Sequence, residues 1–125
     1  MRQFASCGRW QPKHDVIHDV WHAAKLRGVA FRAIGQEPGW LLEITNGEEI
    51  LIVTDYGGTR SSLPYVDPTI DQEARRTQYV LDTYDTVVEI RGVRCTDTMS
   101  GEQFEVSVTI YQTDRELHGC GRALF

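Results

Sequence analysis

Three of the four histidines, His14, His18 and His22, are spaced four residues apart. In a helix this spacing places them one turn apart on the same flank. Neutral imidazole nitrogens in that arrangement can bind Zn, Cu or Ni, and Asp15 and Asp19 stand beside them in the sequence. The simpler alternative is that the histidines border the apolar face of an amphipathic helix. We therefore keep a metal site as a minor hypothesis.

Asp97, Ser100 and His118 are the residue types of a nucleophilic triad. No nucleophile-elbow glycine pattern surrounds Ser100, and Asp and Ser at these positions more readily bond to the local backbone of a tight turn. Gly57-Gly58 lacks the lysine and the following helix of a phosphate-binding loop. We therefore predict that the chain is not an enzyme and needs no cofactor.

Four residues at expected strand ends or turns could form a ligand-binding surface. Glu37 and Trp40 flank a proline-set turn, where a carboxylate and a large aromatic ring can form one wall of a pocket. Tyr56 and Asp97 occupy similar positions, where a rigid scaffold holds side chains toward solvent. The sequence thus predicts a shared site for an unknown small molecule or protein partner. For Trp40 the alternative is a core residue that anchors its turn.

Cys95 and Cys120 bracket the most regular strand pattern of the chain. Between them apolar and polar residues alternate with period 2, the apolar set being Phe104, Val106, Val108 and Ile110. A turn at 113–115 then sends the chain back, so the two cysteines can become neighbours in a sheet. A disulfide here would stabilise the fold by about 3 kcal/mol and would indicate an oxidising compartment. The alternative is two buried thiols in the cytosol.

Cys7 follows Phe4-Ala5-Ser6, which loosely resembles a lipoprotein-processing site. A secretory signal also needs a basic start and an apolar segment of about 7–15 residues. Only Met1-Arg2-Gln3 precede this stretch. We therefore expect either a signal upstream of the sequence given or an incidental thiol at Cys7.

The elements that would position these residues are one helix followed by strands. Apolar residues at helical spacing predict a helix over 14–27, with Gly28 placed to end it. Period-2 alternation predicts strands over 29–34 and 40–45, and a hairpin at Asn46-Gly47 leads into a hydrophobic strand over 49–54. We expect further strands over 77–81 and 86–91. Two prolines and three acidic residues make 60–76 look like a long surface excursion.

This pattern predicts a mainly β fold, a small antiparallel barrel or sandwich preceded by one short N-terminal helix. We expect residues 1–13 to be a flexible lead-in or tether and 14–125 to be a single domain, because 125 residues suit one core. The net charge of -5 and the lack of a basic stripe argue against nucleic acid as a partner. No apolar run is long enough to span a bilayer.

Three segments of the chain resemble an uncharacterised family of bacterial envelope lipoproteins, associated with META-type lipoproteins. They are an F-x-A-x-G-x-E-P-x-W segment at 31–40, a C-x-D-x-M-S segment at 95–100 and a terminal G-C pair at 119–120. Gly39 and Thr98 depart from the family pattern. The resemblance implies export to the periplasm, a lipid anchor on Cys7 and a bridge between Cys95 and Cys120. It implies no activity.

Three functional hypotheses follow. The leading one is a non-enzymatic periplasmic lipoprotein-type binding domain that contacts the membrane only through a lipid anchor. The second is an inhibitor of a cell-wall hydrolase such as lysozyme, since the acidic charge around Asp67 and Asp71 suits a basic enzyme. The third is a metal-binding envelope protein that uses the histidine flank. The sequence predicts no oligomeric state.

Overall fold

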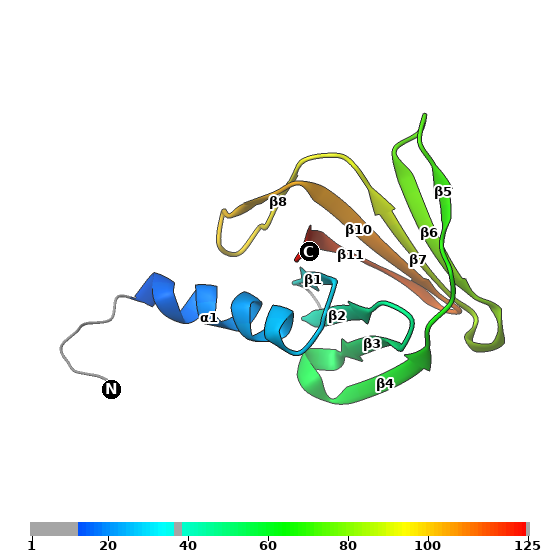
Figure 1. Ribbon diagram of the computed structural model, residues 1–125, viewed down its shortest axis with the longest axis horizontal. Helices are drawn as coiled ribbons and strands as arrows, with labels where there is room; N and C mark the ends of the chain where they lie inside the picture. Colours follow the sequence, from blue (N-terminus) through cyan, green and yellow to red (C-terminus); the bar gives the residue numbers. More distant parts are fainter. Residues whose placement is uncertain (1–12, 37–38, 125) are drawn as a thin grey trace.

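The computed structural model describes residues 13–36 and 39–124, except the side chains of residues 13–19. Figure 1 shows helix α1 (Lys13–Leu26) beside a curled sheet. The helix is followed by β1 (Phe31–Gly35), β2 (Trp40–Thr45), β3 (Glu49–Thr54), η2 (Asp55–Gly57), β4 (Thr59–Pro64), β5 (Thr69–Asp71), β6 (Arg76–Leu81), η3 (Asp82–Tyr84), β7 (Thr86–Arg91), β8 (Cys95–Thr96), β9 (Gln103–Phe104), β10 (Val106–Gln112) and β11 (Arg115–Ala123).

Most strands belong to one sheet, in the order β4-β3-β2-β1-β11-β10-β7-β6-β5. All of its pairs are antiparallel, and β1 joins the two halves by pairing with both β2 and β11. The sheet curls into a half-barrel (Figure 1). β8 and β9 form a separate two-stranded sheet. The mainly β, antiparallel and barrel-like fold behind one short N-terminal helix is therefore confirmed.

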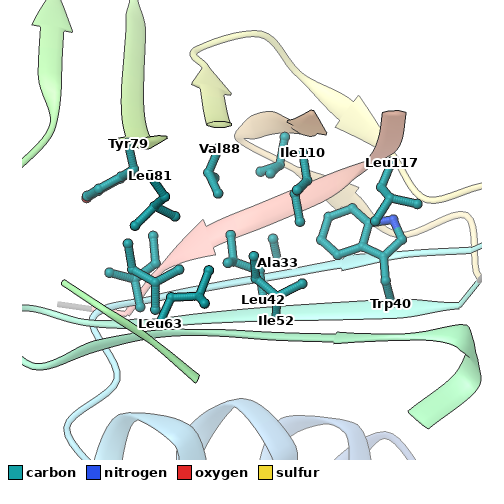
Figure 2. Packing of buried hydrophobic residues seen from close by; sticks show 13 residues of the cluster. Ala33, Trp40, Leu42, Ile52, Leu63, Tyr79, Leu81, Val88, Ile110 and Leu117 are labelled. Atoms are coloured by element: carbon teal, nitrogen blue, oxygen red, sulfur yellow. The ribbon is translucent and has the colours of Figure 1, made fainter. Parts of the chain in front are cut away.

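The concave face of the sheet is filled with apolar side chains (Figure 2). Strands far apart in the sheet order contribute to one cluster, which is possible only because the sheet curls round it. Its buried members are Ala33, Trp40, Leu42, Ile44, Ile50, Ile52, Leu63, Tyr79, Leu81, Val88, Val108, Ile110 and Leu117. The alternating residues of the predicted strands thus face inward, as the period-2 pattern requires.

The helix predicted over 14–27 is confirmed to within one residue at each end. Gly28 ends it, as predicted, with a φ of +93° that glycine adopts without strain. Trp21 and Ala24 are buried, but Val20 is 43 % exposed, so the apolar face is narrower than the sequence suggested. Within the described part of the chain, no helix has the length and apolar character to cross a membrane.

The prediction of a surface excursion over 60–76 is wrong. This stretch contains β4, which pairs with β3 along its whole length, and β5, which pairs with β6. Leu63 is the buried residue of β4, and the rest of that strand is polar or exposed. Because β4 lies at the edge of the sheet, only one of its faces needs apolar residues, and its alternation is too weak to recognise.

A break at Glu105 divides the strand pattern that begins at Phe104. It separates β9 from β10, so Phe104 leaves the face shared by Val106 and Val108. Phe104 packs instead in a second, smaller cluster with Trp21, and the centroids of the two rings are 5.7 Å apart. Cys120, which lies on β11 away from the main core, belongs to the same cluster.

Arginines and a buried carboxylate fasten the helix end to the outer face of the sheet. Glu43 of β2 is 4 % exposed and accepts hydrogen bonds from Arg27 at 3.0 and 3.1 Å and from Arg32 at 3.1 Å. Burial alone would raise the pKa of Glu43, but the two guanidinium groups outweigh it and hold the pKa below its usual range. The Arg32 and Arg122 guanidiniums lie 4.6 and 5.0 Å from the centre of the Trp21 ring.

Candidate ligand pocket beside the disulfide

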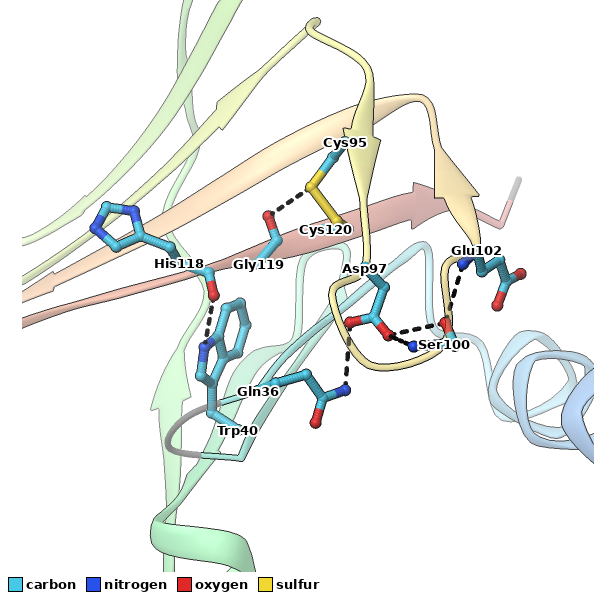
Figure 3. The surroundings of a disulfide bond; sticks show 9 residues. All are labelled: Gln36, Trp40, Cys95, Asp97, Ser100, Glu102, His118, Gly119 and Cys120. Carbon is cyan, nitrogen blue, oxygen red and sulfur yellow. Dashed lines mark hydrogen bonds between the residues drawn. A yellow bond between two sulfur atoms is a disulfide. The ribbon is translucent and has the colours of Figure 1, made fainter.

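Cys95 and Cys120 form a disulfide, as predicted, with their Cα atoms 5.5 Å apart. The bond joins β8 to the outer face of β11 (Figure 3). The Cys95 sulfur also lies 3.3 Å from the Gly119 carbonyl oxygen. A disulfide sulfur carries no proton, so this is a contact and not a hydrogen bond. The bond holds the β8–β9 hairpin against the sheet.

Asp97 organises the turn of this hairpin. Its Oδ2 accepts hydrogen bonds from the Ser100 backbone N–H at 2.9 Å and the Ser100 hydroxyl at 2.8 Å. Its Oδ1 accepts a bond from the Gln36 Nε2 at 3.3 Å, across from the end of β1 (Figure 3). Asp97 therefore closes its own turn and also ties that turn to β1.

The Asp97 carboxylate is ionised at neutral pH although it is only 5 % exposed. Burial by itself would raise its pKa. The hydrogen bonds from Ser100 and Gln36 outweigh that effect, and the pKa of Asp97 lies below its usual range. The turn thus carries a fixed negative charge.

A pocket of about 300 Å³ lies between this hairpin and the outer face of β10 and β11. We call it the disulfide pocket. It is lined by Gly35, Gln36, Cys95, Thr96, Asp97, Thr98, Ser107, Val108, Thr109, His118, Gly119 and Cys120. This volume is at the lower end of the range for small-molecule sites. Its lining combines hydroxyl groups, one amide and one carboxylate with the apolar surface of the disulfide.

Thr109 and His118 of the pocket lining lie close to each other and to Glu116. The Thr109 hydroxyl lies 3.3 Å from the His118 Nδ1, and the His118 Nε2 lies 3.4 Å from a Glu116 carboxylate oxygen. Both contacts are slightly longer than a typical hydrogen bond between a nucleophile and its base, a distance that is often longer in unliganded proteins, and the His118 side chain is 68 % exposed. Asp97 and Ser100 bond to each other within their turn, as the sequence suggested, and not to His118.

Two glycines allow the indole of Trp40 to pack behind the pocket. A Cβ atom on Gly35 would lie 1.9 Å from the Trp40 Nε1, and one on Gly119 would lie 2.6 Å from the Trp40 Cζ2. The Trp40 N–H donates a hydrogen bond to the His118 carbonyl oxygen at 3.3 Å. Trp40 is thus a core residue that supports the pocket from beneath, which was the alternative considered for it.

The four predicted ligand residues do not all line one pocket. Asp97 lines the disulfide pocket. Tyr56 is 78 % exposed and, with Trp40, lines a different and mainly apolar hollow of about 260 Å³. Glu37 lies outside the described residues.

The proposed lipid anchor and most side chains of the proposed histidine metal site also lie outside the part of the chain that the structure describes. Cys7 is not described, nor are the side chains of His14 and His18. His22 is exposed. Among the described residues, no group of three or more His, Cys, Asp or Glu side chains could hold a metal ion. The lipid anchor and the histidine site remain predictions.

Sequence reasoning missed most of the polar lining. Gln36, Ser107 and Thr109 lie at ordinary outward positions of strands or strand ends, and nothing local distinguishes them. Gly35 and Gly119 did carry a signal, because a glycine inside a strand often marks a close approach of another group.

Comparisons with protein-family models, with curated proteins and with solved structures found no match to this chain. The function must therefore be argued from the geometry of the site.

Proposed function

We propose that this chain is a non-enzymatic binding domain that holds a small polar molecule in the disulfide pocket. The observation that carries this proposal is that both sides of the pocket are fixed. The disulfide ties β8 to β11, and the bond between Gln36 and Asp97 ties the hairpin turn to β1. A site with pre-positioned walls loses little conformational entropy when it binds.

The charge of the lining suggests the class of ligand. Asp97 is an ionised carboxylate, and the lining contains no lysine or arginine; its one basic group is the imidazole of His118, which is largely exposed to solvent. An anionic ligand would be repelled, whereas an ammonium group or a neutral molecule rich in hydroxyl groups would be accepted. The hydroxyls of Thr96, Thr98 and Ser107 supply donors and acceptors for such a molecule.

We also propose that the protein acts in the bacterial envelope, tethered through Cys7. The disulfide supports this location, because such bonds persist in oxidising compartments. The resemblance of three segments to envelope lipoproteins supports it as well. Mass spectrometry of native material tests the proposal: a lipid-modified Cys7 is expected, and an unmodified Cys7 thiol would contradict the anchor.

Three sugars that share a ring and differ in charge test the binding proposal. We expect saturable binding of glucosamine, weaker binding of N-acetylglucosamine and no binding of glucuronate, measured by ¹H–¹⁵N NMR at about pH 7, where most of the amine is protonated. Asp97→Asn should remove the preference for glucosamine. Asp114→Asn, which removes an exposed carboxylate at the β10–β11 turn, should not.

Ser107→Phe provides a second variant that leaves the Asp97 turn intact. The larger side chain on β10 should fill the pocket and abolish binding of all three sugars. If no sugar binds to the wild-type chain, or if glucuronate binds best, the proposed site is wrong.

A further inference from the structure

Another hollow, separate from the disulfide pocket, is lined by arginines. Two cavities of about 500 and 510 Å³ share Arg94 and Glu105 in their linings. Arg122 lines one of them and Arg75 the other. We call the two together the arginine groove. None of its lining residues lines the disulfide pocket.

The backbone of Arg75 is fixed beside this groove, and its side chain lies over Gly92. Its φ of +53° lies in the left-handed region, which is strained for a residue with a side chain. Its carbonyl oxygen accepts a hydrogen bond from the Gly92 N–H at 2.8 Å. A Cβ atom on Gly92 would lie only 2.9 Å from the Arg75 Nε, so the guanidinium group lies directly over this glycine. The absence of a side chain at position 92 makes this placement possible.

The charges of the groove are poorly balanced by the protein itself. Within residues 13–36 and 39–124, several arginines pair with carboxylates, namely Arg27, Arg32, Arg76, Arg91, Arg115 and Arg122. In the same part of the chain neither Arg75 nor Arg94 forms an ion pair. Glu105 is the one carboxylate in the lining. The groove is therefore locally positive on a chain whose net charge is -5.

We propose that the arginine groove binds an oxyanion, a phosphate or carboxylate group carried by a small molecule. A guanidinium group presents a planar fork of N–H donors that matches either group with two parallel hydrogen bonds. The Arg75 guanidinium already lies over Gly92 in this groove, where such a group could reach it. The site is independent of the disulfide pocket, whose lining favours the opposite charge.

Titration of the full chain with inorganic phosphate and, separately, with citrate tests this proposal. Ionic strength is kept constant with sodium chloride, and ¹H–¹⁵N NMR follows the backbone and arginine Nε–H signals. We expect saturable shifts at Arg75, Gly92 and Arg94. Saturation by phosphate alone would identify a phosphate ligand, and saturation by citrate alone a carboxylate ligand.

Four variants separate the site from general charge effects. Arg75→Gln and Arg94→Gln should each weaken binding about tenfold, the effect of losing a charged hydrogen-bond donor. Gly92→Ala should do the same while keeping every charge, because its methyl group displaces the Arg75 guanidinium. Arg60→Gln removes one exposed charge from β4, outside the groove, and should leave binding unchanged.

Two results would overturn the proposal. One is a chemical shift change that grows linearly with the concentration of both phosphate and citrate and never saturates. The other is an equal loss of binding in Arg60→Gln and Arg75→Gln, which would show only the influence of net charge.

Discussion

Different interactions stabilise the concave face and the outer face of the sheet. On the concave face, apolar residues from most of the strands form one cluster. On the outer face around β1 and β11, a small aromatic cluster is joined by a disulfide, arginine–aromatic contacts and the ion pairs of Glu43. Both the disulfide pocket and the arginine groove include residues of the hairpin that is fastened there.

This difference suggests that the concave face stabilises the fold and that the outer face positions the two candidate sites. The concave face supplies most of the stability through burial of apolar surface, which is non-directional and tolerant of change elsewhere. The outer face depends on a few specific bonds that position a short hairpin. A change on the outer face should therefore alter the sites while leaving the sheet intact.

The largest effect is expected from Leu42→Ala on the concave face. Leu42 is fully buried, so the change should lower the free energy of unfolding by about 4 kcal/mol through lost transfer energy and the cavity left behind. Urea unfolding measures it. Val80→Ala, at a 41 % exposed position, should cost less than about 1 kcal/mol. Equal costs for the two would contradict the assignment of the core.

The next largest effect should follow removal of the disulfide in the double variant Cys95→Ser and Cys120→Ser. The free energy of unfolding should fall by about 3 kcal/mol, because the unfolded chain gains freedom. Hydrogen exchange should accelerate in 95–104 and remain slow in β2 and β10. Uniform acceleration over the whole sheet would show that the two faces are not separable.

A smaller effect is expected from Glu43→Gln, which should lower the free energy of unfolding by about 2 kcal/mol at neutral pH. Arg32, whose side chain is 12 % exposed, supplies most of it, because Arg27 is 58 % exposed and screened by water. The folded-state pKa of Glu43 is lowered, so its contribution is present above the ordinary pKa of glutamate and is lost as the pH falls through the folded value.

The difference in stability between the wild type and Glu43→Gln should therefore shrink below about pH 4. Glu48→Gln, at an exposed turn, serves as the control and should show no such dependence. A difference that stays constant down to about pH 2 would contradict the ion-pair account.

The smallest effect should come from Ser100→Ala in the hairpin turn. Loss of the hydroxyl removes one hydrogen bond to Asp97 and one from the Glu102 N–H, and in this partly exposed turn it should lower the free energy of unfolding by about 1 kcal/mol. It should also move the pKa of Asp97 upward, toward the usual value of aspartate. A ¹³C NMR titration of the carboxyl group measures this shift, with Thr113→Ala as the control. An unchanged pKa would mean that the Ser100 hydroxyl does not stabilise the charge.

The concave face could be predicted from the sequence, because each of its strands repeats one local pattern. Val108 and Ile110 alternate with polar residues, and Gly47 adopts the positive φ expected at the predicted hairpin, although Asn46 does not. The outer face could be predicted only in part. The cysteine pair identified its cross-link, yet Gln36 and Asp97 meet across 61 residues of chain. No local pattern encodes such a contact.

The central claim is that the Cys95–Cys120 bond creates the disulfide pocket. Its most direct test compares glucosamine titrations of the oxidised chain and of the double serine variant, followed by ¹H–¹⁵N NMR. We expect saturable shifts at Thr96, Ser107 and His118 in the oxidised chain and none in the variant, in which the amides of β2 and β10 should still exchange slowly with solvent. Equal affinity in both proteins would contradict the claim.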